Sequence, residues 1–518
     1  MQTMGDLVER NARYFPAHEA FVQGDRRLTH AQFAGRARRL ASALYELGLR
    51  RQDRVAMLAM NSIEYCEFFA AAELAGYIAT MMNFRLTVPE LSWLIKDSSP
   101  RILIFEEQYA STVEQLRDQF KEVTHYICIG AAPPWALSYE ALVARGSPEG
   151  PPIRSTAEDY AYLWYTSGTT GRPKGVAWRH DKLLASAQIQ AEVAPLPGDS
   201  RLLQITPMFH VGGRGYVSGA LWSGATIVID RSFDPVRMLQ TIEKERVTFT
   251  FMVAAMLQAV LDVPGVESYD LSSMRTIVSA AAPIPVPLLK RGIALLGPIF
   301  SVQYGCTEVG QITSLARHLV DPNGSPEQVR RLASVGHPVP HIEFRLVDEQ
   351  GADCAVGKPG EVVIRSASQL DGYWNNSIAS LETIRDGWYH TGDIGLADEE
   401  GYLFLVDRKK DMIISGGENV YSREVEDAVA EHPQVADVAV IGVPDSKWVE
   451  SVKAVVVLKR GAQVTDAELI AHCRTLIAGY KCPKSVAFVE ELPRLPSGKI
   501  NKVELRDRYR RSTDQSTT

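Results

Sequence analysis

The sequence predicts an α/β protein with a large N-terminal domain and a small, mobile α+β C-terminal domain. Helical and strand patterns alternate up to about residue 340, and short strands separated by turn residues follow from about residue 341. A compact segment of helices and strands completes the chain. At 518 residues the chain exceeds one ordinary hydrophobic core, so several lobes are expected.

The first half has the local signals of parallel α/β units. Thr29 and Gln32 form a capping-box pattern ahead of a helical run, and Gly48 stands where that run should end. The apolar run 54–60 predicts a buried strand, and Asn61 is a candidate cap for the next helix. Further strand-like runs begin at residues 102, 225, 247, 275 and 300. Strands separated by helices predict two parallel-type subdomains with ligand crevices at the strand ends.

The second half predicts a β-rich lobe and then a separate domain. Residues 341–351, 360–366 and 401–407 read as short strands. The charged stretch DRKKD follows at once and predicts a hinge. We therefore expect a large domain at 1–406, a hinge at 407–411 and a small domain at 412–518. Within the small domain, Ser422 should begin one helix, and Thr465 with Glu468 should cap another.

Composition excludes several classes of protein. Hydrophobic residues make up 46% and charged residues 23%, as in globular domains. A net charge of -7 gives no basic surface for nucleic acid. The apolar stretch 68–82 is interrupted by Glu73, so it predicts a buried helix rather than a transmembrane segment. The start carries Asp6 and Glu9 and does not resemble a targeting peptide. Six scattered cysteines predict neither disulfides nor zinc, and a cytoplasmic protein is expected.

The most informative segment is YTSGTTGRPKGV, at 165–176. It gathers hydroxyls, glycines and Lys174 directly after a strand-like run. Glycine allows the backbone to approach a ligand closely, and N–H groups, hydroxyls and an ammonium group bind polyphosphate. It is not a Walker A loop, because Pro173 precedes the lysine and no Ser or Thr follows it. Taken alone, the segment is also compatible with a flexible surface linker.

This segment resembles the signature phosphate loop of the adenylate-forming superfamily, which includes acyl-CoA ligases, peptide-synthetase adenylation domains and luciferases. Further segments match the superfamily's motifs in order: PMFHVGG at 207, AAAP at 280, YGCTE at 304, YHTGD at 389, DRKKDMIISGGENVYSREVE at 407 and PRLPSGKI at 493. The resemblance covers nearly the whole chain and is strongest to acyl-CoA ligases of the fatty-acid or aryl-acid type.

The resemblance implies a site for ATP and Mg²⁺. Glu308 should bind Mg²⁺, a hard ion that prefers carboxylate and phosphate oxygens. Tyr304 should stack on adenine and Thr307 should reach a phosphate oxygen. Asp393 and Arg408 should hold the ribose, because a carboxylate accepts from both hydroxyls and a guanidinium donates in a fixed fork. The other implied nucleotide-binding positions are Ser167, Gly168, Thr169, Thr170, Gly171, Lys174, Ala282 and Pro283.

The implied catalytic residues are Lys499, Thr166, Glu308 and His210. Lys499 matches the superfamily's adenylation lysine and should bridge the substrate carboxylate and the α-phosphate. His210 should border the acyl pocket and gate the entry of the carboxylate. The residues expected to line that pocket are Phe209, Val211, Gly212, Ala280, Ala281, Gly305 and Gly310. Because small residues predominate, we expect an aryl, cyclic or medium-chain acid rather than acetate.

A second half-reaction with coenzyme A is also implied. The small domain should rotate about Lys410 and remove the adenylation lysine from the site. Gly416 and Gly417 should then form the wall of a narrow pantetheine tunnel. Trp448 and Tyr480 match positions that contact the CoA nucleotide in some acyl-CoA ligases. Cys482 stands where some relatives have a basic residue, so a phosphate contact there stays open.

The predicted activity is therefore ATP-dependent ligation of a small-molecule carboxylic acid to CoA, through acyl-AMP. One alternative keeps the first step and uses an amine or a carrier-protein thiol as the acceptor. The other is a non-catalytic acyl or nucleotide sensor, against which the intact Glu308, Asp393, Arg408 and Lys499 argue. The sequence is also compatible with a homodimer.

Overall fold

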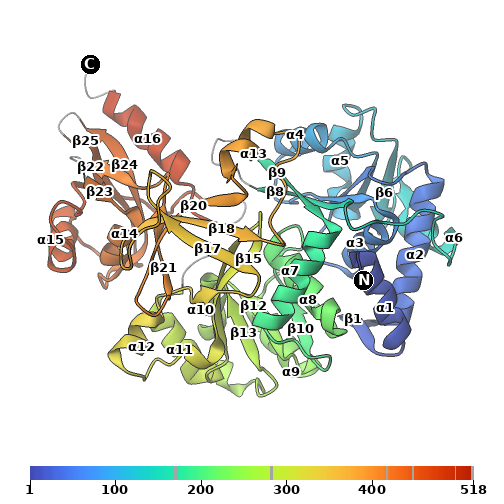
Figure 1. The fold of residues 1–518 in the computed structure, drawn as a ribbon, viewed down its shortest axis with the longest axis horizontal. Helices are drawn as coiled ribbons and strands as arrows, with labels where there is room; N and C mark the ends of the chain where they lie inside the picture. Colours follow the sequence, from blue (N-terminus) through green and yellow to red (C-terminus); the bar gives the residue numbers. More distant parts are fainter. Residues whose placement is uncertain (167–172, 281–283, 416–417, 446–447, 496–497, 515–518) are drawn as a thin grey trace. The chain divides into compact units, whose positions relative to one another are not determined.

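The structure is a computed structural model that describes residues 1–166, 173–280, 284–415, 418–445, 448–495 and 498–514. The chain forms two compact units (Figure 1). Unit 1 comprises Met1–Phe344 and Ile364–Tyr389, and unit 2 comprises Arg345–Val363 and His390–Thr518. The domain boundaries expected at 406 and 412, and the hinge between them, stay predictions.

One sheet of unit 1 has seven strands and is parallel except at β8 and β9, which form an antiparallel pair. The predicted strands at 54 and 102 are confirmed as β3 and β5. In spatial order the strands are β7 (Leu137–Ser138), β6 (His125–Ile129), β5 (Ile102–Glu106), β3 (Arg54–Leu58), β4 (Ile78–Met81), β8 (Tyr160–Thr166) and β9 (Lys174–Arg179).

The second sheet of unit 1 has nine strands, with a parallel centre and antiparallel edges. The predicted strands at 225, 247, 275 and 300 are confirmed as β11 to β14. In spatial order the strands are β16 (His337–Pro338), β15 (Gly310–Leu315), β14 (Phe300–Cys306), β13 (Thr276–Ser279), β12 (Phe249–Met252), β10 (Arg201–Gln204), β11 (Thr226–Ile229), β1 (Glu19–Gln23) and β2 (Arg26–Thr29). These sheets confirm the predicted α/β class.

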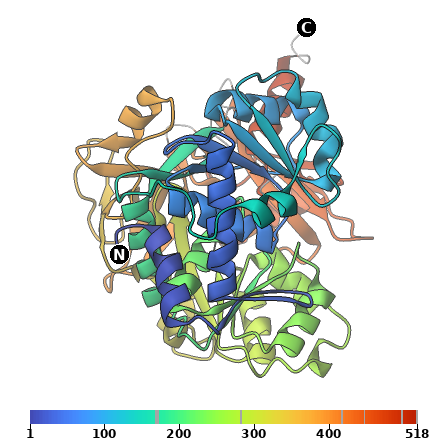
Figure 2. The ribbon, with the colours of Figure 1, turned by 90° about the vertical axis from the view of Figure 1, so that its right-hand side faces the viewer.

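Helices connect the strands of unit 1, and Figure 2 shows the dark-blue helices α1 and α2 beside each other. Helices α7 and α8 also pack side by side (Figure 1). The helices are α1 (Met4–Tyr14), α2 (His30–Glu46), α3 (Ile63–Ala75), α4 (Val88–Ser98), α5 (Ala110–Arg117), α6 (Tyr139–Arg145), α7 (His180–Val193), α8 (Val211–Ser223), α9 (Pro235–Glu245), α10 (Ala254–Leu261), α11 (Val286–Leu296), α12 (Pro326–Arg331) and α13 (Ser377–Thr383).

Of the two helix starts predicted in the first half of the chain, that of α2 is confirmed and the cap of α3 is wrong by one residue. Thr29 and Gln32 form the expected capping box of α2. Helix α3 is capped by Ser62, whose hydroxyl accepts from the Tyr65 N–H at 3.1 Å. Asn61 was the expected cap, but its side chain accepts from the Met208 N–H at 2.9 Å instead. A long-range contact therefore engages the residue that the local pattern favoured.

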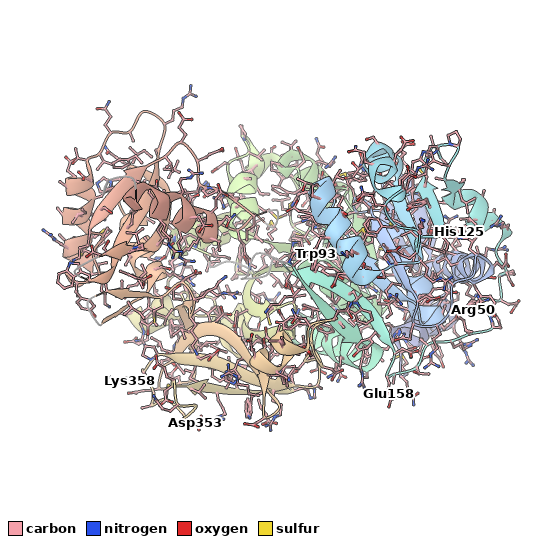
Figure 3. The ribbon with its side chains drawn as sticks, turned by 90° about the horizontal axis from the view of Figure 1, so that it is seen from above. Arg50, Trp93, His125, Glu158, Asp353 and Lys358 are labelled. Atoms are coloured by element: carbon pink, nitrogen blue, oxygen red, sulfur yellow. The ribbon has the colours of Figure 1, made fainter. Side chains whose placement is uncertain are left out.

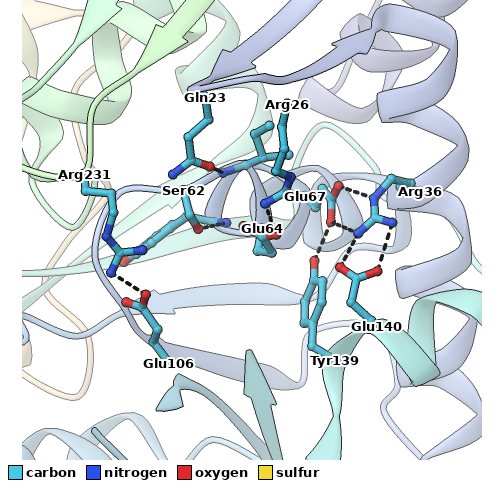
Figure 4. Close-up of polar contacts among 12 residues, drawn as sticks. Gln23, Arg26, Arg36, Ser62, Glu64, Glu67, Glu106, Tyr139, Glu140 and Arg231 are labelled. Carbon is cyan, nitrogen blue, oxygen red and sulfur yellow. Dashed lines mark hydrogen bonds and ion pairs between the residues drawn. The ribbon is translucent and has the colours of Figure 1, made fainter. Parts of the chain in front are cut away.

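Helix α3 is buried, and its carboxylates have cationic or hydroxyl partners (Figure 4). Arg26 pairs with Glu64 at 2.7 Å, and Glu67 binds Arg36 at 2.5 Å and the Tyr139 hydroxyl at 2.8 Å. The helix expected over 68–82 is shorter than predicted, because α3 ends at Ala75 and the left-handed Gly76 leads into β4. Among the described residues, no helix combines the length and the apolar character that crossing a bilayer requires.

The boundaries between the two units fall inside three strands of a five-stranded sheet, β17, β18 and β20. Its strands are β17 (Ile342–Val347), β18 (Gly360–Ser366), β20 (Trp388–Ala397), β19 (Ile384–Arg385) and β21 (Leu403–Arg408), the last paired with β20. The predicted strands of the β-rich lobe at 341, 360 and 401 are thus confirmed as β17, β18 and β21.

The rest of unit 2 is a mixed five-stranded sheet with three helices. Helix α14 begins at Ser422 and α15 carries the Thr465 and Glu468 capping box, as predicted. The strands are β23 (Glu418–Val420), β22 (Ile413–Ser415), β25 (Val449–Leu458), β24 (Val435–Asp445) and β26 (Ser485–Phe488), and the helices are α14 (Ser422–Ala430), α15 (Asp466–Leu476) and α16 (Lys502–Asp514).

Candidate active site

The predicted phosphate loop connects two paired strands. Thr166, the last residue of β8, lies opposite Lys174, the first residue of β9. The adjoining Tyr165 is anchored, since its hydroxyl donates to Asp97 at 2.7 Å and its ring lies 6.0 Å from that of Trp93 on α4, labelled in Figure 3. Both ends of the loop therefore rest on a fixed hairpin. Ser167, Gly168, Thr169, Thr170 and Gly171 lie outside the described residues.

The predicted metal-binding carboxylate lies in the turn between β14 and β15. The Tyr373 hydroxyl donates to Glu308 Oε1 at 3.0 Å. Backbone hydrogen bonds hold both partners, because Leu370 N–H donates to the Glu308 carbonyl at 2.9 Å and Trp374 N–H donates to the Gly175 carbonyl at 2.7 Å. Burial, reinforced by the glutamate charge, raises the pKa of Tyr373, so its hydroxyl stays protonated and donates.

Tyr373 also contacts the lysine of the phosphate loop. Lys174 Nζ lies 4.8 Å from the centroid of the Tyr373 ring, within the range of a cation–π interaction. One tyrosine thus links Lys174 and Glu308, which the sequence assigned separately to phosphate and metal. Sequence reasoning missed this residue. The available signal was the aromatic GYWN segment at 372–375, between the strand predicted at 360 and the motif at 389.

The residues present fit a Mg²⁺ ion that is bound together with phosphates. No group of three or more His, Cys, Asp or Glu side chains suited to a metal occurs in the described part of the chain. Mg²⁺ is commonly held by one or two carboxylates plus substrate phosphates. Glu308 offers the carboxylate, and Lys174 would hold the phosphates that supply the other oxygen ligands. Thr307 is fixed next to it, since its carbonyl accepts from Trp178 Nε1 at 2.9 Å. Tyr304 is buried on β14, and its contact with adenine stays a prediction.

Three of the residues assigned to the acyl pocket, Phe209, Val211 and Gly212, lie at the start of α8. His210 occupies the N-cap position of that helix, between Phe209 and Val211. The Phe209 ring meets Phe84 edge to face at 5.4 Å, and a Cβ atom added at Gly212 would lie 3.6 Å from the Phe251 ring. Aromatic rings therefore surround this end of the helix. The gating role of His210 stays a prediction.

The two glycines near Glu308 have a structural reason beyond pocket size. A Cβ atom at Gly305 would lie 2.0 Å from the Gly310 carbonyl oxygen, and Gly310 itself adopts a φ of +88°. The β14–β15 turn therefore excludes side chains at both positions. Ala280 follows β13 directly, whereas Ala281, Ala282 and Pro283 lie outside the described residues.

Unit 2 holds the predicted ribose-binding pair. Asp393 on β20 lies opposite Arg408 on β21, and Arg408 Nε contacts Asp393 Oδ1 at 2.6 Å. The Asp393 carboxylate is buried, whereas the arginine side chain is 44% exposed. The structure thus brings together two residues that the sequence predicted to act on one ligand group. Their contact with ribose stays a prediction.

The remaining predicted residues of unit 2 lie on connections between elements. Lys410 lies in the turn from β21 to β22, and Lys499 is exposed in a turn where its carbonyl accepts from Leu495 N–H at 2.8 Å. Trp448 and Tyr480 are also exposed. Gly416 and Gly417 lie outside the described residues.

Cys482 is buried in the core of unit 2, and its thiol points to backbone carbonyls at Ile477 and Ala478. Burial raises the pKa of this thiol and keeps it neutral. The side chain therefore serves packing and offers no charge to a phosphate, which answers the question that the sequence left open at this position.

These features are those of an α/β protein whose hairpin in unit 1 carries groups suited to a metal–polyphosphate ligand. A family model described as AMP-binding enzyme matches residues 8–374, and one described as AMP-binding enzyme C-terminal domain matches residues 424–499. The chain belongs to the AMP-binding enzyme family. The resemblance to the adenylate-forming superfamily that its motifs carry is thereby confirmed.

Individual relatives match along nearly their whole length. A feruloyl-CoA synthase from Amycolatopsis sp is 38% identical over 515 residues, which cover 98% of this chain and 99% of that protein. An indoleacetate–CoA ligase from Aromatoleum aromaticum is 35% identical and covers 99% of this chain and 100% of that protein. The solved structure of the amide bond synthetase McbA from Marinactinospora thermotolerans superposes with a TM-score of 0.88 at 28% identity, covering 98% of this chain and 100% of that one.

We predict that Tyr373→Phe raises the Mg²⁺ concentration needed for half-maximal pyrophosphate release about tenfold. The variant removes a hydrogen bond to a charged group, which typically contributes about 1.5–3 kcal/mol. Titrating Mg²⁺ at saturating ATP and acid measures the effect. Tyr126→Phe is the matched control. Tyr126 lies on β6, away from the phosphate-loop hairpin, and its hydroxyl donates to the Arg117 carbonyl. An unchanged Mg²⁺ requirement in Tyr373→Phe would contradict the role assigned to this hydroxyl.

Proposed function

We propose that this chain ligates a hydrophobic aryl, cyclic or medium-chain carboxylic acid to coenzyme A through an acyl adenylate. It is an acid–thiol ligase that forms AMP and pyrophosphate, and its cofactors are ATP, Mg²⁺ and coenzyme A. The observation that carries the proposal is the Lys174–Tyr373–Glu308 arrangement close to the phosphate-loop hairpin. The aromatic surroundings of Phe209 and Gly212 support a hydrophobic acid, and the names of two relatives refer to aromatic acids.

In the first step the chain stabilises negative charge where it develops. Lys174 would bind the phosphates that leave as pyrophosphate, and Glu308 would hold the metal ion. Mg²⁺, when bound, neutralises phosphate charge and polarises the phosphorus centre. Tyr373 fixes the direction of the Glu308 carboxylate by its hydrogen bond. Lys499 approaches the carboxylate and the α-phosphate of the substrates, where an aimed cation lowers the barrier.

In the second step we propose that the small C-terminal domain, residues 412–518, turns about Lys410 and admits the thiol. The turn around this residue has anchors on both sides. Asp407 accepts from the Ser422 hydroxyl at 3.1 Å and also from its N–H, while Lys502 Nζ donates to the same hydroxyl at 2.7 Å. Asp411 pairs with Arg506 on α16. Both tethers lead to the small domain, and its rotation has to be absorbed by a few backbone dihedrals at this element boundary, as hinges require.

The identity of the acceptor is tested by offering several nucleophiles to the adenylating enzyme. Pyrophosphate release is measured across a carboxylic-acid panel with CoA, hydroxylamine or amino acids present. We expect aryl acids with CoA to give thioester at the highest turnover. An amide product formed in preference to thioester would favour the amine-acceptor alternative, which the likeness to an amide bond synthetase raises. Binding of acid and ATP without any pyrophosphate release would favour the alternative of a non-catalytic acyl or nucleotide sensor.

We predict that Lys499→Ala lowers the rate of acyl-AMP formation by a factor on the order of 10² to 10³. Thioester formation from supplied acyl-AMP should stay close to the wild-type rate, because this lysine acts only in the adenylating orientation. Lys459→Ala is the control, as that side chain is an exposed lysine of unit 2 whose ammonium donates to the Pro433 carbonyl. Equal losses in both half-reactions of Lys499→Ala would refute the two-orientation proposal.

We predict that Lys410→Pro allows acyl-AMP to form and accumulate, while thioester formation falls at least tenfold. Proline fixes φ near -65° and restricts the preceding residue, so it stiffens the turn between the two anchored carboxylates. The hydrogen bonds from Asp411 and Met412 N–H to the Arg408 carbonyl can persist in this variant. Thermal unfolding measured beside both half-reactions separates a stiff hinge from lost stability. A variant of normal stability that performs both steps at wild-type rates would exclude Lys410 as the pivot.

A further inference from the structure

A buried polar layer lies between the nine-stranded sheet and the helices that cover it. It contains three glutamines, Gln190 on α7, Gln303 on β14 and Gln311 on β15. Gln190 is 1% exposed and Gln303 is 3% exposed. Gln311 Nε2 donates to Gln190 Oε1, while Gln190 Nε2 and Gln311 Oε1 are buried without a partner among the described residues. Gln303 has a different partner, the Tyr216 hydroxyl of α8, which donates to its Oε1 at 2.9 Å.

The Gln303 amide is only half satisfied. Its Nε2 atom is fully buried and has no hydrogen-bond partner among the described residues. Buried amide groups in native proteins nearly always have a partner, either from the protein, an ordered water or a ligand. A buried glutamine side chain at this place in β14 therefore points to a polar group that arrives with a ligand.

Contacts connect this amide to the predicted acyl site. The Tyr216 ring stacks on Phe251 with centroids 5.0 Å apart and planes 20° apart. Gly212 is one of the positions assigned to the acyl pocket. A Cβ atom added there would have the same Phe251 ring as its nearest neighbour. Gly212, Phe251, Tyr216 and Gln303 thus form a continuous series within unit 1. A ring bound along Phe251 and Tyr216 would meet the amide at the end of an aromatic surface.

We propose that Gln303 is a specificity-determining residue that binds a ring hydroxyl of an aromatic acid. A hydroxyl group both donates and accepts, so it can pair with either atom of the amide while Tyr216 holds the other. An apolar ring would leave the amide buried and unsatisfied, which is how a polar pocket rejects a substrate that lacks the hydroxyl. The proposal rests on the proposed function and narrows its substrate class from hydrophobic acids to hydroxyaryl acids.

The test compares kcat/KM for ring-hydroxylated cinnamic acids with that for cinnamic acid and its ring-methylated analogues. Ortho, meta and para isomers are included, with CoA-dependent pyrophosphate release as the readout. The wild type should prefer one hydroxylated isomer on the order of tenfold to hundredfold over both the unsubstituted and the methylated acid. In Gln303→Leu this ratio should fall to about one. Gln190→Leu is the matched control, because the Gln190 amide is equally half-satisfied but pairs with Gln311 and not with Tyr216. This variant should keep the wild-type ratio.

Tyr216→Phe gives a second route if Gln303→Leu does not fold. It removes the hydroxyl that orients the amide, so the preference for the hydroxylated acid should also decrease. Absence of any hydroxyl preference in the wild type, or an unchanged ratio in Gln303→Leu or Tyr216→Phe, would overturn the proposal while leaving the ligase function standing. An equal loss of preference in Gln190→Leu would overturn the specific role of Gln303. Failure to release pyrophosphate with every acid would overturn the proposed function itself.

Discussion

A buried ion pair between Arg214 and Glu73 joins the parts of unit 1 on which the candidate site depends. Arg214 lies in the first turn of α8 and contacts Glu73 of α3 at 2.6 Å, with both side chains almost fully buried. The same guanidinium donates to the Tyr162 hydroxyl of β8 at 3.1 Å. Strand β8 ends at the phosphate loop, and α8 begins at Val211 directly after its N-cap His210, so the pair couples the two segments. Removing one partner of such a pair leaves an uncompensated charge and typically costs about 3–5 kcal/mol, because neither ion is hydrated.

A separate set of contacts keeps the charged groups of the candidate site in one arrangement. Lys174 is positioned by the strand pair of the hairpin, and Glu308 by a turn that two glycines make possible. The two segments also meet directly, since Trp178 Nε1 of β9 donates to the Thr307 carbonyl of the turn. Tyr373 adds a connection between the charged groups themselves, since its ring faces the ammonium group and its hydroxyl binds the carboxylate. A preorganised site of this kind needs little rearrangement when phosphate charge develops, which is the main source of electrostatic catalysis.

Features encoded within a few residues could be predicted from the sequence, and features that depend on distant partners could not. The capping boxes at Thr29 and Thr465 span four residues each, and both are present. Asn61 and Ser62 are equally good caps by local rules, and a contact with Met208 decided between them. The Tyr373–Glu308 bond joins residues 65 positions apart, and the Arg214–Glu73 bond spans 141. Their spacing follows from the packing of sheets and helices, for which one sequence has no periodic signal.

The same distinction explains why the reaction class is easier to infer than the substrate. The groups that act on ATP lie in short segments with rigid backbone requirements, such as the glycines of the β14–β15 turn, so their residue types are tightly constrained. The groups proposed to meet the acyl moiety are side chains contributed separately by β12, β14 and α8. Each can change without altering the backbone, and their chemistry emerges only from their combination. Tyr216 is an ordinary core aromatic until it is seen to hold the Gln303 amide at the end of an aromatic surface. Under the proposal made for Gln303, substrate choice therefore depends on a buried pair of side chains that no short segment encodes.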